Sequence, residues 1–345
     1  MRPLFWLSCC LAFVRCTAEE PVVSGNRNSG DWLIPIDEVV DTGSGKSGIP
    51  ALNFPRKIRP VQAEYLSNED SVIGVLINNT PLAYPEIILN WHEIINDSVN
   101  GFHFSVTHSP LSGVSRVYSR SAGNRLANAG LVYRQNLIFY DESTNTNWLQ
   151  YTGQAINGEQ LGRALTPVSF LKTRWDTWQS LYPDTEVITS ETGYQRNYNR
   201  YPYGNYRNAD YFFYRSTFTD TLLPPKTQVV GLSTERSSKA YVAADLSTSA
   251  EVMVDTIRDT PVLFYASRAR QLYAAFQLSG LPASSYTPVS DELPVIVTDT
   301  LGNRINFSGQ VVTGPDIGTD LQPVATEKTF WFTWQQFNPE TRLEE

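Results

Sequence analysis

One series of residues occurs twice along this chain, in the same order and at a nearly constant offset. The two copies share a glycine within an apolar run, an Ala-Tyr pair, an aspartate, two tryptophans three positions apart, and a proline followed two positions later by threonine. The matched segments are 72–75 with 229–232, 83–84 with 240–241, 97–99 with 255–257, 175–179 with 331–335, and 183–185 with 339–341. Chance hardly produces such an ordered series. We therefore predict two related units, residues 71–190 and 227–345, packed about a pseudo-twofold axis.

Short apolar runs separated by turn residues indicate many short strands in both units. Val, Ile, Tyr, Phe and Thr dominate these runs, and 21 glycines and 21 prolines help to interrupt them. Helical patterns are confined to residues 85–95 and 173–181. The predicted fold class is mostly β, a β-rich α+β fold with short helical turns. Each tryptophan pair is expected to close a core, because rings three positions apart share one side of a helical turn.

Two further segments lie outside the predicted units. Residues 19–70 contain several prolines and glycines, and we expect an extended N-terminal arm wrapped on the first unit. Residues 191–226 form a connector that opens with a stretch dense in Tyr, Asn, Arg and Gly. Because that stretch has almost no aliphatic side chains, it cannot form a core of its own. We expect a surface loop or a strap over the seam between the units.

The first 18 residues have the pattern of a secretory signal peptide. Arg2 supplies a positive charge, an apolar run follows, and Thr17 and Ala18 provide small residues for cleavage. The run is too short to cross a bilayer, which needs about 20 apolar residues, and no later run approaches that length. We expect cleavage after Ala18 and a soluble, secreted, extracellular protein without a membrane span.

The cysteine positions restrict the chemistry of the mature chain. The three cysteines, Cys9, Cys10 and Cys16, all lie within the predicted signal peptide. A cysteine-free mature chain excludes disulfides, thiol catalysis and cysteine-ligated zinc. The formal net charge is −8 and the basic residues are scattered, so a nucleic-acid partner is not expected.

The histidines provide the candidate metal ligands. His92, His103 and His108 lie close together in the first unit, and His92 with His108, aided by Glu93 or Asp97, is the more plausible transition-metal pairing. The alternative is one structural histidine and two at the surface. Phosphate-loop, nucleophile-elbow and zinc-protease motifs are absent from the sequence, so no catalytic residue is assigned.

The connector and three asparagines are candidate sites for carbohydrate. Tyr194, Tyr198, Tyr201 and Tyr203 are candidates for stacking on a sugar or on a partner's side chains, and a packed connector with buried rings is the alternative. Acceptor sequences for N-glycosylation occur at Asn78, Asn96 and Asn306. Asn78 lies in a predicted turn and is the preferred acceptor, whereas Asn96 has a structural alternative as a cap.

The sequence Asn-Trp-His-Glu-Ile-Ile-Asn-Asp at residues 90–97 resembles the N-W-H-E-I-V-N-D motif of a mostly bacterial family, domain of unknown function 3179. Further similar segments are 32–35, 48–52, 140–141, 148–150, 191–194, 202–204, 330–334 and 339–341. The resemblance covers about residues 31–343 and implies no established activity. Where relatives carry Y-C-P-L-C-G, residues 108–113 read His-Ser-Pro-Leu-Ser-Gly. The resemblance therefore implies that an ancestral thiol site has been lost here, because a hydroxyl is a poor ligand for soft metals.

These observations support two main functional hypotheses. The first is a secreted, non-catalytic structural or binding component of an extracellular matrix, including a mineral-associated one, with matrix components or glycans as partners. The second is a metal-dependent enzyme with a site near His92, Glu93 and His108 and a transition metal ion as cofactor. Carbohydrate binding through the tyrosine-rich connector is a third possibility.

Overall fold

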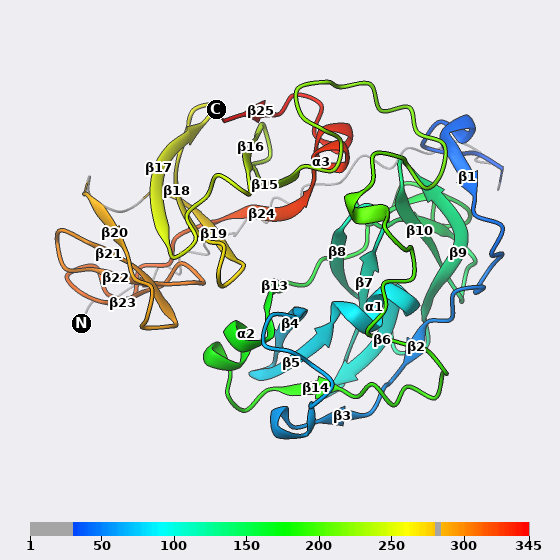
Figure 1. Cartoon of the computed structure of the whole chain (residues 1–345), viewed down its shortest axis with the longest axis horizontal. Coiled ribbons are helices and arrows are strands. Elements are labelled where there is room, and N and C mark those ends of the chain that lie inside the picture. Colours follow the sequence, from blue (N-terminus) through cyan, green and yellow to red (C-terminus); the bar gives the residue numbers. More distant parts are fainter. Residues whose placement is uncertain (1–29, 280–283, 345) are drawn as a thin grey trace, which may run out of the picture.

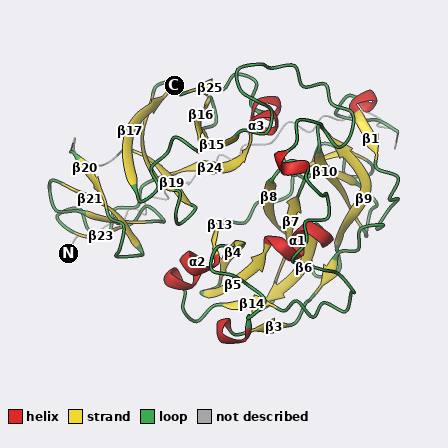
Figure 2. Cartoon of the chain, in the orientation of Figure 1, coloured by secondary structure: helices red, strands yellow, loops and turns green. Residues whose placement is uncertain are grey.

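A computed structural model describes residues 30–279 and 284–344 (Figure 1). The predicted signal peptide, its three cysteines and residues 19–29 of the predicted arm lie outside the described residues. Strands and loops make up most of the chain, and the helices are short (Figure 2). The mostly β fold class is confirmed. The helical segments predicted at 85–95 and 173–181 contain α1 (Glu86–His92) and α2 (Trp175–Leu181).

Three sheets are built from the residues before the connector. The first has the order β1 (Val39–Asp41), β9 (Leu126–Tyr133), β10 (Asn136–Asp141), β11 (Asn147–Leu149), β12 (Gln154–Asn157). The second has the order β2 (Leu52–Asn53), β6 (Ile94–Val99), β7 (Phe102–Ser109), β8 (Val114–Ser119). The third has the order β13 (Leu171–Arg174), β4 (Ser71–Ile77), β5 (Thr80–Pro85), β14 (Glu186–Ile188), β3 (Lys57–Ile58). Strands β1, β2 and β3 belong to the arm, so the arm extends all three sheets.

Two sheets follow the connector, which contains the short 3-10 turn η3 (Tyr206–Asn208). The larger has the order β17 (Glu251–Ile257), β18 (Thr260–Ser267), β19 (Leu272–Gln277), β24 (Pro323–Phe330), β15 (Gln228–Ser233), β16 (Ser238–Val242), β25 (Arg342–Leu343). The smaller has the order β20 (Tyr286–Pro288), β21 (Val295–Asp299), β22 (Arg304–Asn306), β23 (Val311–Thr313). Helix α3 (Trp331–Phe337) follows β24, and two 3-10 turns in the arm are η1 (Ile36–Glu38) and η2 (Pro60–Gln62).

One arrangement of four strands and a helix occurs in both halves. Strands β13, β4, β5 and β14 pair in the order antiparallel, antiparallel, parallel, as β24, β15, β16 and β25 do. Helix α2 follows β13 directly, and α3 follows β24 directly. Four of the five matched segment pairs therefore occupy corresponding places in or beside this arrangement, and the fifth, 97–99 with 255–257, lies outside it in β6 and β17. The extent of two complete units and their symmetry axis remain predictions.

The matched residues also make matched contacts within each half. A Cβ atom added to Gly74 would lie 2.3 Å from the ring of Trp178, and one added to Gly231 would lie 2.4 Å from the ring of Trp334. Both indoles are buried. Each donates a hydrogen bond from Nε1 to a threonine Oγ1 seven positions later, at 2.9 Å for Trp178 and 2.8 Å for Trp334. Only a glycine lets the indole lie this close to the strand in either half.

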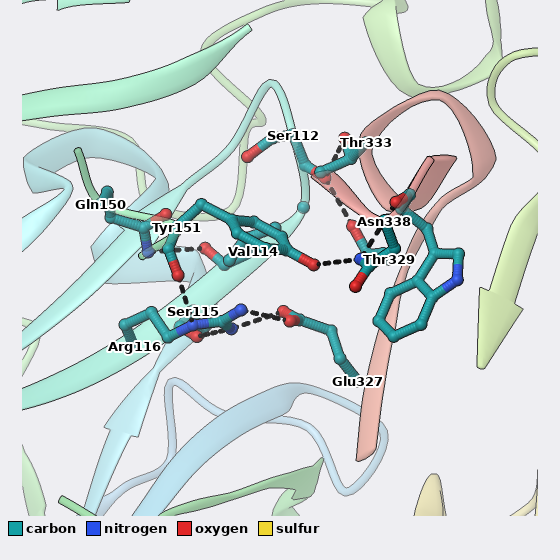
Figure 3. Close-up of polar contacts among 12 residues, drawn as sticks. Ser112, Val114, Ser115, Arg116, Gln150, Tyr151, Glu327, Thr329, Thr333 and Asn338 are labelled. Carbon is teal, nitrogen blue, oxygen red and sulfur yellow. Dashed lines mark hydrogen bonds and ion pairs between the residues drawn. The ribbon is translucent and has the colours of Figure 1, made fainter. Parts of the chain in front are cut away.

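Polar contacts join the two halves at a seam between β8 and the β24–α3 segment (Figure 3). Arg116 on β8 forms an ion pair with Glu327 on β24 at 2.5 Å, and both side chains are mostly buried. The amide of Asn338 donates a 2.8 Å hydrogen bond to the hydroxyl of Tyr151. The seam is therefore closed by charged and polar side chains as well as by packing.

Candidate functional site

The family-like segment 90–97 begins in α1 and ends in β6. Ile88 and Leu89 are fully buried and fix the inner face of the helix. The helix ends where Glu93 adopts a left-handed backbone conformation with φ 58° and its N–H bonds back to the carbonyl of Leu89 at 2.7 Å. This sharp end turns the chain into β6 and leaves the adjacent side chains of His92 and Glu93 among segments from three parts of the sequence.

The imidazole of His92 is fully buried between the arm and the connector. Its Nδ1 lies 2.8 Å from the carbonyl oxygen of Pro50, and its Nε2 lies 2.7 Å from the hydroxyl of Tyr198. That hydroxyl also lies 2.5 Å from Oγ1 of Thr192. Burial lowers the pKa of His92, which favours the neutral ring. Both nitrogens are therefore occupied in fastening the arm and the connector together.

Glu93 is a buried carboxyl held by two neutral donors. The hydroxyl of Tyr203 donates to Oε1 at 2.6 Å, and Nδ2 of Asn128 donates to Oε2 at 2.5 Å. Burial raises the pKa of Glu93 to about 7, and these two hydrogen bonds only partly oppose the shift. A carboxyl in this setting changes its charge near neutral pH.

This setting predicts a stability that depends on pH through Glu93. The folded-state pKa of Glu93 is about 7 and exceeds the ordinary value of 4.5. The protonated carboxyl therefore contributes its full stabilisation to the folded state below about pH 4.5, and this stabilisation is lost as the pH rises to 7. Glu93→Gln removes that loss, and we expect it to gain on the order of 3 kcal/mol relative to wild type between pH 5 and pH 8. Urea unfolding at the two pH values measures the difference. Glu159→Gln, at an exposed carboxylate, is the control, and an equal gain in both variants would contradict the assignment.

His108 lies in a second buried group beside Glu86, the first residue of α1. Its Nδ1 lies 3.0 Å from the hydroxyl of Ser115, and its Nε2 lies 3.9 Å from Oε1 of Glu86. Burial lowers the pKa of His108 to about 3, so the ring is neutral at physiological pH.

The structure gives His92, Glu93 and His108 separate partners. The ring of His92 bonds to the arm and the connector, the carboxyl of Glu93 bonds to Tyr203 and Asn128, and His108 faces Glu86. Within residues 30–279 and 284–344, no group of three or more His, Cys, Asp or Glu residues is placed to hold a metal ion. The metal-site prediction gains no support from this geometry.

Sequence reasoning missed the main structural role of the segment 109–113. Side chains from remote segments donate to the carbonyl oxygens of four of its five residues, 110–113. Tyr201 bonds to Pro110 (3.0 Å), Tyr206 to Leu111 (3.0 Å), Thr329 and Thr333 to Ser112 (2.8 and 3.1 Å), and Lys172 to Gly113 (3.2 Å). We call this the carbonyl clamp. It joins the first half to the connector and to the second half.

Ser109 and Ser112, which the resemblance aligns with two cysteines of relatives, are buried within the same segment. The hydroxyl of Ser109 accepts a 3.2 Å hydrogen bond from the N–H of Leu137, and that of Ser112 accepts one of 3.0 Å from the amide of Asn136. Both hydroxyls thus belong to an internal polar network.

The four candidate stacking tyrosines fall into two groups. Tyr198, Tyr201 and Tyr203 each use their hydroxyl to bind an internal partner, and the ring of Tyr201 lies against the guanidinium of Arg207 at 4.1 Å. Tyr194 differs, because its side chain is 43% exposed and its ring lies 5.1 Å from that of His92. Of the four, Tyr194 is the one best placed for an external ligand.

A surface pocket of about 350 Å³ opens beside this tyrosine. It is lined by residues 51–56, Glu191, Thr192 and Tyr194. Phe54 is 49% exposed and holds a left-handed backbone conformation with φ 50°, which is unusual and strained for a bulky side chain. Arg56 and Glu191 form an exposed ion pair between the two lining segments. The pocket thus combines two exposed aromatic rings with groups that donate and accept hydrogen bonds.

The predicted glycosylation sites differ in their exposure. Asn78 is exposed in the turn between β4 and β5. Asn96 is fully buried, and its amide nitrogen donates to Asn53 and to the carbonyl of Leu126, so a glycan there is incompatible with this packing. Asn306 is half-buried, and its side-chain oxygen accepts hydrogen bonds from Ser308 and Gln310. These positions favour Asn78, the preferred acceptor.

The fold and the site define a mostly β protein whose polar motif at residues 90–97 lies largely inside the molecule, next to an aromatic pocket at its surface. The family described as "Protein of unknown function (DUF3179)" matches residues 46–341, and the chain belongs to this family. Its family resemblance is therefore confirmed. Neither a curated protein nor a solved structure matches the chain. Within the described ranges, each helix is too short or too polar to span a membrane.

Proposed function

We propose that this protein is a secreted, non-catalytic binding component of the extracellular matrix, and that its ligand is a glycan held in the pocket beside Tyr194. The observation that carries the proposal is the position of Phe54 and Tyr194 in one polar-rimmed pocket. Exposed aromatic rings stack on the apolar faces of sugars, and the neighbouring polar groups bond to their hydroxyls. The pocket volume of about 350 Å³ suits one or two sugar residues.

The polar motif supports this proposal through its position behind the pocket. His92 contacts the ring of Tyr194 and bonds through Tyr198 to Thr192, so it fixes one wall. It also bonds to Pro50, which directly precedes the opposite wall. Rigid walls lower the cost of ordering the site when a ligand binds. In this proposal the motif holds the binding site in shape, and it does not carry out a reaction.

A glycan array with the secreted protein, followed by calorimetry with the best ligand, tests the proposal. We expect Tyr194→Ala to weaken binding about fivefold or more, because stacking on an aromatic ring supplies on the order of 1 kcal/mol or more. Tyr211→Ala is the matched control, since Tyr211 is 52% exposed in the same connector but does not line the pocket. Equal glycan binding by the Tyr194→Ala and Tyr211→Ala variants would exclude this pocket as the binding site.

Two further measurements test the remaining parts of the proposal. N-terminal sequencing of the exported protein is expected to begin at Glu19. Elemental analysis separates the binding protein from a metal-dependent enzyme, because a stoichiometric transition metal that is lost in His92→Ala would favour the enzyme.

A further inference from the structure

Three positive side chains gather around one buried carboxylate near the seam between the halves. Glu86 forms ion pairs with Lys172 of β13 at 2.8 Å and with Arg207 of η3 at 2.5 Å. Lys328 of β24 interacts electrostatically with Lys172, Glu86 and Arg207. The next residue, Thr329, donates to the carbonyl of Ser112, directly before the carbonyl of Gly113 that accepts from Lys172. We call Glu86, Lys172, Arg207 and Lys328 the cationic cluster.

The charges within the cationic cluster do not balance. Three cations face the single carboxylate of Glu86, whose pKa is held well below its usual range because Lys172 and Arg207 outweigh the effect of burial. The adjacent His108 contributes no charge, since burial keeps its ring neutral. The cluster therefore carries a net charge of about +2 in a partly buried place, where unpaired charges are costly.

Lys328 holds the least compensated of these charges. Among the described residues no carboxylate lies within 4.0 Å of its ammonium group, and its hydrogen bond to the side-chain oxygen of Gln271 is long, at 3.5 Å. Burial first, and then the charge of Lys172, lower the pKa of Lys328 to about 8. The ammonium group is thus poorly stabilised by its own protein.

An unsatisfied buried atom lies beside the same cluster. Nε2 of His108 is buried and has no hydrogen-bond partner, and Oε1 of Glu86 lies 3.9 Å from it. Buried polar atoms nearly always have a partner, either in the protein or in a bound molecule. This unsatisfied atom is an observation independent of the charge count, and a bound polar molecule would give it a partner.

We propose that the cationic cluster binds a small oxyanion, coordinated by Lys328 together with Lys172 and Arg207. An oxyanion would neutralise part of the excess charge and supply acceptors for ammonium and guanidinium donors. The outer edge of the cluster is accessible to a small ion, because the side chains of Lys172 and Arg207 are 21% and 36% exposed. This site is separate from the pocket beside Tyr194, so either can fail without the other.

Thermal unfolding of the full secreted chain tests the site with inorganic phosphate, sulfate and acetate, each compared with chloride at equal ionic strength. We expect at least one of these oxyanions to raise the Tm of the wild type in a saturable manner. Lys328→Met is expected to weaken the fitted affinity at least tenfold. Arg258→Gln, at a cation that is 62% exposed, is the control and keeps the wild-type response.

The Tm in chloride alone gives a second readout. Lys328→Met is expected to unfold at a higher temperature than the wild type, because it removes a poorly compensated charge, whereas a merely structural lysine would lower the Tm when replaced. Phosphorus NMR line broadening on the wild type detects phosphate binding without any variant. A wild-type Tm that does not respond to any of the three oxyanions, or an equal response in Lys328→Met, would overturn the proposal.

Discussion

Replacing Gly74 by alanine is expected to lower the free energy of unfolding by about 3 kcal/mol or more. The added Cβ atom would lie 2.3 Å from the ring of Trp178, which is buried and bonded through its Nε1 to Thr185. The indole cannot retreat without breaking that bond and disturbing the core, and overpacking of this kind costs about 1–3 kcal/mol or more. Urea unfolding followed by tryptophan fluorescence measures the loss.

Three variants make this test specific. Gly231→Ala is expected to cost a similar amount, because the corresponding distance to the ring of Trp334 is 2.4 Å. Gly123→Ala is the control, since a Cβ atom there would meet nothing within 4 Å. Adding Trp178→Leu to Gly74→Ala should cost less than the sum of the two single changes, because the smaller side chain relieves the clash. Equal stability of the Gly74 and Gly123 variants would show that the close approach has been misread.

Arg116→Met is expected to destabilise the folded chain by about 3 kcal/mol, because it leaves the carboxylate of Glu327 largely buried without its partner. The side chains of this pair are 20% and 14% exposed, and the guanidinium also donates to the carbonyl of Tyr151 at 3.1 Å. Since the pair joins β8 to β24, its loss weakens the seam directly (Figure 3). Calorimetric unfolding of the variant and the wild type at neutral pH provides the measurement.

Two comparisons separate this effect from a general loss of charge. Arg125→Met breaks an ion pair with Glu142 that is 46% and 35% exposed, and we expect it to cost less than about 1 kcal/mol. Adding Glu327→Leu to Arg116→Met removes the unpaired carboxylate and should restore part of the stability. A similar cost for Arg116→Met and Arg125→Met would contradict the role of the buried pair.

Local patterns were sufficient to predict many of the strands, the helices α1 and α2, and the burial of the paired tryptophans. Runs of β-branched and aromatic residues bounded by turns correspond to strands such as β4 and β15, because side-chain alternation and turn chemistry are local properties. The tryptophans of α2 and α3 are buried as their three-residue spacing indicated. Gly74 and Gly231 recur in the matched segments because each meets an indole.

The candidate site was less predictable, because its partners are distant in sequence. Proximity along the chain suggested that His92, Glu93 and His108 act together. In the structure, His92 instead bonds to Tyr198, 106 positions away, and Glu93 bonds to Tyr203, 110 positions away. The tyrosine-rich composition of the connector did indicate a strap, but which hydroxyls are internal depends on tertiary packing. The excess charge around Lys328 likewise exists only once both halves are in contact.

The carbonyl clamp has a consequence for how the chain reaches its final shape during synthesis. Residues 109–113 emerge from the ribosome long before Tyr201, Tyr206 and Thr329, which donate to their carbonyl oxygens. Until those donors have been synthesised, the carbonyl oxygens must be hydrated by water. The segment 109–113 therefore cannot reach its final set of hydrogen bonds while the nascent chain grows. A chain that stopped at the connector would lack the threonines of the second half permanently. The first half thus reaches its final structure only when the last part of the chain has been translated. A premature stop leaves the carbonyl oxygen of Ser112 without its threonine donors.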